Sequence, residues 1–168
     1  MNEDDFWELL HQSRQQYNSI VGTDDPDLSA FKSAGGKIVQ WHGLADELIF
    51  PNGSSNYYER VLERVAKAQD FYRLFEVSGV DYCFGGSGAF PWTAFDSLVK
   101  WVEGGKAPDT LDAATIPVSE TETPKHRPLC LYPQVAAYKG GDPDQASSFE
   151  CADTFGSKKA VAEGPSEL

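Results

Sequence analysis

Basic residues are scarce in this chain of 168 residues. Lys and Arg together number 14, against 26 Asp and Glu, and the formal net charge is −12. Nucleic acids and anionic membrane surfaces are bound through clusters of Lys and Arg. We therefore expect neither a nucleic-acid partner nor a membrane partner. The acidity is spread along the chain, which favours a role in solubility.

Long apolar runs are also lacking. No stretch approaches the roughly 20 apolar residues that a transmembrane helix needs. The first residues, Met1 to Asp5, are acidic, whereas a secretory signal peptide has a basic start and then an apolar stretch. We therefore expect neither a membrane span nor a signal peptide in this sequence.

Cysteine is limited to Cys83, Cys130 and Cys151. An odd number allows at most one intrachain disulfide, and a leftover cysteine in a secreted protein suggests a missing partner. The alternative is three reduced thiols in a cytosolic protein. Composition alone favours this alternative.

What is present is a clear alternation of helix and strand patterns. Hydrophobic periodicity predicts helices at 5–20, 28–34, 54–68 and across 95–102, and strands at 37–42 and 71–77. Asp27 is the expected N-cap of the second helix. The strand–helix–strand order predicts a parallel pair with a right-handed crossover. Two strands are too few for an isolated sheet, so we expect the edge of a larger α/β sheet.

The pattern weakens after Pro108. Residues 109–155 are rich in Pro and Thr and contain two of the three cysteines. We interpret them as an irregular strap that wraps over the surface. Residues 156–168 are rich in Gly, Ser, Lys and Glu and are expected to be a disordered tail. The expected organisation is one partial domain at 1–155, followed by this tail.

Two loops qualify as functional, because ligands of open α/β sheets bind at the carboxyl ends of the strands. The first, 41–49, reads W-H-G-L-A-D-E-L-I, and the second, 77–89, reads V-S-G-V-D-Y-C-F-G-G-S-G-A. The first loop carries an H-G-x-x-D-x-x-I pattern. Further motifs in the same order are D-P-D-L-S-A-F at 25–31, W-V-E-x-G-K-A-P at 101–108 and R-P-L-C-x-Y-P at 127–133.

This combination resembles the fungal tannase and feruloyl esterase family. The resemblance runs from about residue 20 to Cys151 and implies the C-terminal portion of an α/β-hydrolase. It also implies a secreted serine esterase that hydrolyses small phenolic esters, such as feruloyl or galloyl esters, by a Ser-Asp-His mechanism. In that chain order the acid precedes the histidine.

Carried over by resemblance, Asp46 occupies the position of the triad acid, which holds the histidine in the correct tautomer. Tyr82 occupies the position of the triad histidine, in S-G-V-D-Y-C where the family has P-G-x-x-H-C. A tyrosine has a pKa of about 10 and is a poor general base at neutral pH. His42 is interpreted as a loop histidine bonded to backbone. The other histidines, His11 and His126, carry no catalytic signal.

The family's nucleophile lies upstream, in a C-x-x-G-G elbow that this sequence does not contain. Ser87, within G-G-S-G-A, imitates the G-x-S-x-G elbow but is interpreted as loop. No serine–histidine pair is therefore expected. The function expected here is that of a truncated, inactive family member; the alternative is a non-catalytic remnant or binding module, which Tyr82 favours.

The resemblance also bears on the cysteines and on metals. In the family the cysteine after the histidine pairs with one beside the nucleophile, so Cys83 is expected to be unpaired, which leaves Cys130 and Cys151 as a bridge. The family binds calcium in a lid domain that is almost wholly absent here. Asp24, Asp25 and Asp27 are read as a turn and a helix cap, and no cofactor or metal is expected in this chain.

Overall fold

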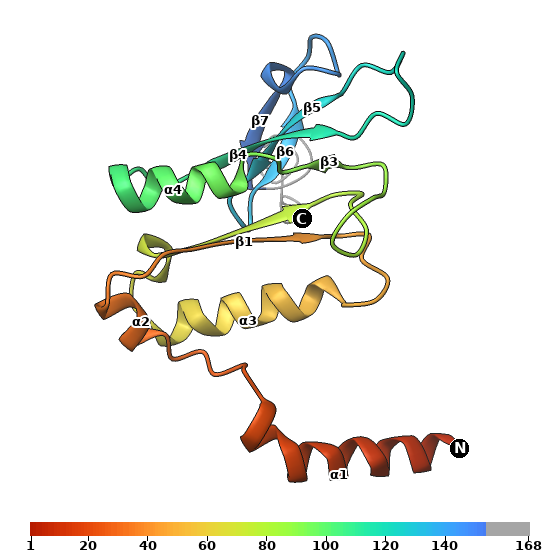
Figure 1. The fold of residues 1–168 in the computed structure, drawn as a ribbon, viewed down its shortest axis with the longest axis vertical. Helices are drawn as coiled ribbons and strands as arrows, with labels where there is room; N and C mark the ends of the chain where they lie inside the picture. The colour runs from red at the N-terminus through yellow and green to blue at the C-terminus, as the bar shows by residue number, and fades with distance from the viewer. Residues whose placement is uncertain (154–168) are drawn as a thin grey trace, which may run out of the picture.

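The computed structural model describes residues 1–153. The expected tail at 156–168 lies outside the described residues. The chain begins with α1 (Glu3–Val21), whose N-terminus is closed by a reciprocal pair of hydrogen bonds between Asn2 and Asp5. Figure 1 shows α1 standing apart from the rest of the chain, and none of its residues is buried.

The centre of the fold is the predicted strand–helix–strand unit. It consists of β1 (Ile38–Gly43), α3 (Pro51–Arg64) and β2 (Tyr72–Val77). The strands pair in parallel, from Ile38 opposite Tyr72 to Gly43 opposite Val77. Helix α3 and helix α4 (Ala94–Gly104) lie on opposite faces of this pair (Figure 1). The expected α/β class is thereby confirmed.

Two apolar clusters hold the strands, one on each face. Tyr72 and Leu74 of β2 pack with Tyr58 and Val61 of α3. On the other face, Phe75 and Val77 of β2 belong to a second cluster. Their partners in it are Val80, Ala89, Leu111, Ala113 and Leu129. A strand that is buried on both faces has apolar side chains on both, and Tyr72, Leu74, Phe75 and Val77 made β2 identifiable from the sequence in spite of Arg73 and Glu76.

Two helices differ in detail from expectation. Helix α2 (Ser29–Ser33) has Leu28 in the cap position without a side-chain cap. Asp27 instead accepts a hydrogen bond from the Ser29 amide at 3.1 Å. In α4 the buried side chain is Trp101, whereas Phe95 of the expected stripe is 74% exposed. Trp101 is the larger apolar surface, and Lys37 and Arg73 lie over its ring.

The expected irregular strap is in fact built of short antiparallel strands. Within 109–155 they are β4 (Thr110–Thr115), β5 (His126–Cys130), β6 (Val135–Tyr138) and β7 (Phe149–Ala152). Strand β4 also pairs with β3 (Ala89–Phe90), which precedes α4 in the chain. They form a sheet of order β3-β4-β5 and a pair β6-β7. Strands of two to six residues with few apolar positions carry almost no periodic signal, so the sequence did not reveal them.

The expected disulfide is present and ties these two sheets together. It joins Cys130 at the end of β5 to Cys151 in β7, with 5.6 Å between the Cα atoms. Cys83, the remaining cysteine of the sequence, is free and exposed.

Candidate functional site

The two loops after β1 and β2 are joined through their backbones. The Leu44 amide donates to the Val77 carbonyl at 2.9 Å, and the Ala45 amide donates to the Val80 carbonyl at 3.1 Å. Gly43 makes this approach possible, because a Cβ there would lie 2.2 Å from the Val80 oxygen. The glycine of the H-G-x-x-D loop therefore has a steric reason.

The Asp46 carboxylate lies inside the first loop and is held at both oxygens. Its Oδ1 accepts hydrogen bonds from the backbone amides of Leu48 at 2.9 Å and Ile49 at 2.8 Å. Its Oδ2 lies 3.1 Å from His42 Nε2. Burial alone raises the pKa of Asp46, but the two amides and His42 outweigh it, so the pKa lies below its usual value. Asp46 is thus a buried carboxylate in its ionised form.

His42 connects Asp46 to the first turn of α3. Its Nε2 lies 3.0 Å from the Ile49 carbonyl as well as beside Asp46, and its Nδ1 lies 2.7 Å from Ser54 Oγ. Both partners of Nε2 are acceptors, so Nε2 carries the proton. The expected backbone bond of His42 is present, and the structure adds two side-chain partners, Asp46 and Ser54.

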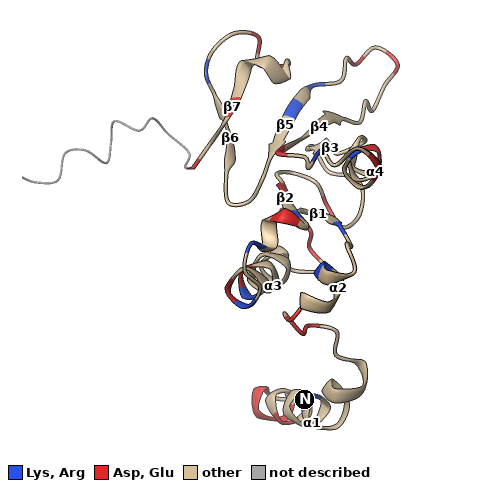
Figure 2. Cartoon of the chain, turned by 90° about the vertical axis from the view of Figure 1, so that its left-hand side faces the viewer, with Lys and Arg blue, Asp and Glu red and all other residues tan. Residues whose placement is uncertain are grey.

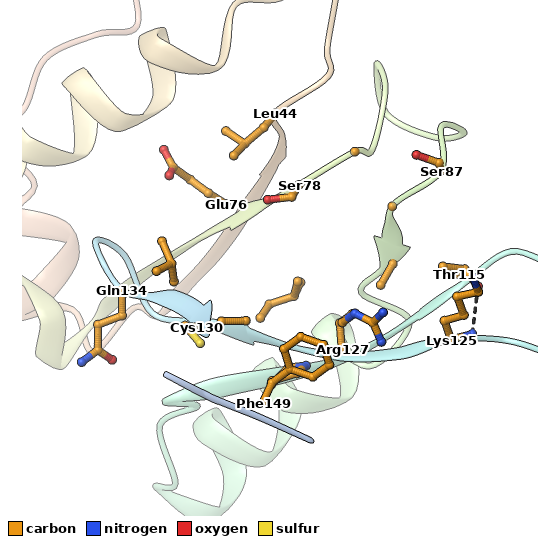
Figure 3. Close-up of a pocket in the computed structure, with 17 residues that line it drawn as sticks. Leu44, Glu76, Ser78, Ser87, Thr115, Lys125, Arg127, Cys130, Gln134 and Phe149 are labelled. Atoms are coloured by element: carbon orange, nitrogen blue, oxygen red, sulfur yellow. Dashed lines mark hydrogen bonds between the residues drawn. The ribbon is translucent and has the colours of Figure 1, made fainter. Parts of the chain in front are cut away.

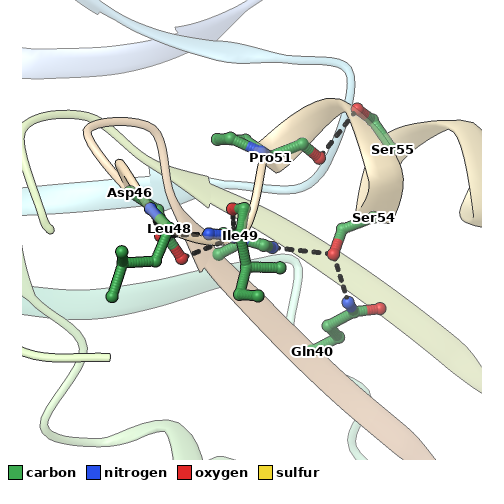
Figure 4. Close-up of polar contacts among 8 residues, drawn as sticks. Gln40, Asp46, Leu48, Ile49, Pro51, Ser54 and Ser55 are labelled. Carbon is green, nitrogen blue, oxygen red and sulfur yellow. Dashed lines mark hydrogen bonds and ion pairs between the residues drawn. The ribbon is translucent and has the colours of Figure 1, made fainter. Parts of the chain in front are cut away.

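Ser54 is a member of this hydrogen-bonded group that sequence reasoning missed. A serine–histidine pair was not expected, and the Ser54–His42 contact corrects that expectation. Ser54 Oγ also accepts from Gln40 Nε2 at 2.9 Å (Figure 4). The sequence offers one signal for the position of Ser54. Pro51 favours the first position of a helix, which places Ser54 in the first turn of α3.

Tyr82 does not meet Asp46. Its side chain is 44% exposed, and among residues 1–153 no hydrogen bond joins its hydroxyl to the Asp46 carboxylate. It lies in a tight turn in which the Phe84 amide donates to the Tyr82 carbonyl and Cys83 adopts a positive φ of 57°. The structure therefore brings the two loops together, but not the two expected side chains.

The remaining candidates lie elsewhere. His11 is exposed on α1, and His126 begins β5. Of the three aspartates before α2, Asp24 pairs with Arg60 at 3.3 Å and Asp27 with Arg64 at 3.4 Å. No cluster of three or more metal-ligating side chains occurs within residues 1–153.

A cavity of about 480 Å³ opens between the end of β2 and the C-terminal sheets. Figure 3 shows Arg127 and Lys125 at one side of it and Glu76 at the other, with Ser87 on the glycine-rich loop. The Arg127 guanidinium lies 4.5 Å from the centre of the Phe149 ring. Burial and the nearby Glu59 carboxylate raise the pKa of Glu76. Asp46 and Tyr82 are not among the residues that line this cavity.

Comparison with known proteins identifies relatives along almost the whole chain. The sequence model of tannase and feruloyl esterase matches residues 2–152. A protein named "Probable feruloyl esterase" from Arthroderma benhamiae is 46% identical over 158 residues, which cover 91% of this chain and 29% of that protein. Mono(2-hydroxyethyl) terephthalate hydrolase from Piscinibacter sakaiensis is 38% identical over 148 residues, covering 87% of this chain and 24% of that protein.

Solved structures agree with these relatives. Feruloyl esterase B from Aspergillus oryzae superposes with a TM-score of 0.74 at 28% identity, covering 90% of this chain and 33% of that one. Tannin acyl hydrolase from Aspergillus niger superposes with a TM-score of 0.75 at 29% identity, covering 89% of this chain and 28% of that one.

The curated relatives are much longer than this chain. The chain spans less than a third of the length of the curated relatives described above. No helix within residues 1–153 is long and apolar enough to cross a membrane. With the match over residues 2–152 and the shared α/β fold, the chain belongs to the tannase and feruloyl esterase family.

Proposed function

We propose that this chain supplies the acid loop of a carboxylic ester hydrolase for phenolic esters of the feruloyl or galloyl type, with Asp46 as the triad acid. The observation that carries the proposal is the Asp46 carboxylate, ionised and held by the Leu48 and Ile49 amides at the carboxyl end of β1. A fixed, charged carboxylate at this place is what a histidine base needs in order to be oriented and stabilised as an imidazolium.

We further propose that the chain does not carry out this reaction by itself. Tyr82 stands at the position of the histidine base, and a tyrosine is a poor general base at neutral pH. A secreted location is proposed as well, on the basis of the family and of the Cys130–Cys151 bridge, because such bridges persist in oxidising compartments.

A chimera tests the assignment of both residues. Residues 2–152 of this chain replace the matching segment of the Arthroderma benhamiae relative, and hydrolysis of methyl ferulate is measured. The chimera is expected to be inactive, to gain activity with Tyr82→His, and to lose it again with Asp46→Asn by about 10³- to 10⁴-fold. Glu47→Gln, an exposed neighbour in the same loop, is the control and is expected to keep that activity.

Two results would contradict the proposal. Activity of the chimera with Tyr82 in place would show that the base lies elsewhere. Activity that survives Asp46→Asn in the Tyr82→His chimera would show that Asp46 is not the acid.

The second candidate is a binding module, and the cavity beside β5 favours it. The Arg127 guanidinium is stacked on Phe149 and uses one N–H for the His126 carbonyl, so its other donors can face a ligand. A small aromatic carboxylate fits this combination of cation, aromatic ring and apolar wall. Calorimetric titration with ferulate tests it: binding that Arg127→Gln weakens supports a binding module, and no detectable binding removes this candidate.

A further inference from the structure

Ser54, His42 and Asp46 form a hydrogen-bonded serine–histidine–aspartate series within this chain. Ser54 Oγ lies 2.7 Å from His42 Nδ1, and His42 Nε2 lies 3.1 Å from Asp46 Oδ2. A nucleophile bonded to a base, which is oriented by a third group, is the general arrangement of nucleophilic catalysis. None of the three residues corresponds to the upstream serine or to the histidine position at Tyr82 that the family resemblance implies.

The hydrogen bonds at the two ends of this series determine which atoms in it donate and which accept. Burial raises the pKa of Tyr72, so its phenol stays protonated and donates to the side-chain oxygen of Gln40. The amide nitrogen of Gln40 then donates to Ser54 Oγ. At the other end, His42 Nε2 carries the proton, because the Ile49 carbonyl can only accept. A neutral His42 therefore accepts the Ser54 proton at Nδ1, as a general base does.

Ser54 is open to a second hollow of the molecule. The hollow has a volume of about 410 Å³ and is lined in part by Gln40, Ser54, Tyr57 and Arg60. The guanidinium of Arg60, which also lines this hollow, pairs with the Asp24 carboxylate at 3.3 Å. Helix α3 begins at Pro51 and has no side-chain cap, so the positive end of its dipole lies at this region.

We propose that Ser54 and His42 are catalytic residues of a second ester-cleaving site, which takes short-chain carboxylic esters, with Asp46 and Gln40 as positioning residues. The site goes beyond the proposed function, because it uses neither Tyr82 nor a nucleophile from outside the chain. The open hollow of about 410 Å³ suits a short acyl group.

The reaction balances without any oxidant or metal. Ser54 Oγ forms a bond to the ester carbonyl carbon while its proton moves to His42 Nδ1. The bond to the leaving alkoxide breaks, the alkoxide takes the proton from Nδ1, and the alcohol departs. Water then attacks the acyl-serine and gives one proton to Nδ1. Ser54 leaves with that proton, and the carboxylic acid is released. During each step Asp46 and the Ile49 carbonyl stabilise the charged imidazolium.

The test is active-site labelling of the full 168-residue chain with a fluorophosphonate, followed by peptide mass mapping, together with hydrolysis of p-nitrophenyl acetate. We expect one label, on Ser54, and hydrolysis above the buffer rate. Ser54→Ala is expected to abolish both. His42→Gln is expected to reduce both by at least about 10²-fold. Ser55→Ala is the matched control, because Ser55 is adjacent and donates only to the Pro51 carbonyl (Figure 4); both signals are expected to persist in it.

Absence of label from Ser54 in the unsubstituted chain would overturn the proposal, whatever the variants do. Label or hydrolysis that survives Ser54→Ala would also overturn it. The measurement uses this chain alone, with small probes, and is therefore independent of the methyl ferulate result in the chimera.

Discussion

His42 Nε2, near the end of β1, lies 3.1 Å from Oδ2 of Asp46, which is in the loop that follows the strand. Both side chains are largely buried, with 13% and 6% of their surfaces exposed. The backbone amides of Ile49 and Leu48, together with this contact, hold the pKa of Asp46 below its usual value in spite of its burial. The proton on His42 Nε2 also stabilises the negative charge of the Asp46 carboxylate.

Asp46→Asn is expected to destabilise the loop. If the amide oxygen keeps the Leu48 and Ile49 bonds, the amide nitrogen faces the His42 Nε2 proton, and two donors oppose each other. Because the folded-state pKa of Asp46 is lowered, its contribution is present above the unfolded value of about 3.9 and is lost as the pH falls through the folded value. Thermal melts from pH 7 to pH 3 check this: the difference between wild type and variant is expected to shrink at low pH. Glu47→Gln is the exposed control, and an equal difference at all pH values would contradict the account.

Glu76→Gln is expected to stabilise the protein at neutral pH. Burial and the Glu59 carboxylate raise the pKa of Glu76, so its contribution to stability is present below the unfolded pKa and is lost as the pH rises through the folded one. The uncharged amide removes this cost. A gain on the order of 0.5 kcal/mol at pH 7 and none near pH 4 is expected from urea unfolding. A loss of stability at pH 7 would show that the Glu76 charge is favourable where it lies.

The disulfide is expected to be a major contributor to stability. Cys130 and Cys151 are separated by 21 residues, and closing a loop of that length stabilises by about 3 kcal/mol through the unfolded state. Cys151→Ser is expected to show this loss in urea unfolding, whereas Cys83→Ser, at an exposed free thiol, is expected to change little. Peptide mapping after alkylation of the oxidised protein checks the pairing, and a bridge that contains Cys83 would contradict it.

The chain alone is expected to leave methyl ferulate and methyl gallate unhydrolysed. By the family resemblance, the reaction needs a histidine base at the position of Tyr82, and Tyr82 is exposed, without a hydrogen bond to Asp46 in the described part of the chain. Turnover of either ester above a buffer blank, blocked by a serine-directed inhibitor, would contradict this prediction. Labelling at Ser54 without such turnover is consistent with it, because the two measurements use different substrates.

Helix α1 is expected to make the chain associate. It exposes Phe6, Trp7, Leu9, Leu10, Tyr17 and Ile20, and the acidic residues are confined to its first two turns (Figure 2). Replacing Trp7 and Leu10 by Ser is expected to lower the apparent mass in light scattering toward the monomer. Amide hydrogen exchange is expected to be fast in α1 and slowest across β1 and β2. Uniform protection that includes α1 would show that this helix is packed.

The sequence by itself determined the parallel β1–α3–β2 unit, because β2 is buried on both faces and α3 has a stripe of apolar residues. The loop motifs identified the family and singled out Asp46, because a short motif at the end of a strand is a local property. The pairing of Cys130 with Cys151 followed from the family resemblance rather than from the spacing of the cysteines.

Only the tertiary structure decided the rest. The strands β4 to β7 are short and are fixed by their partners and by the disulfide, so no local period reveals them. The approach of Ser54 to His42 depends on how the first turn of α3 lies against the end of β1, across a separation of 12 residues. Hydrogen bonds between side chains of different elements are set by packing. For that reason no sequence pattern singled out Ser54 as the partner of His42.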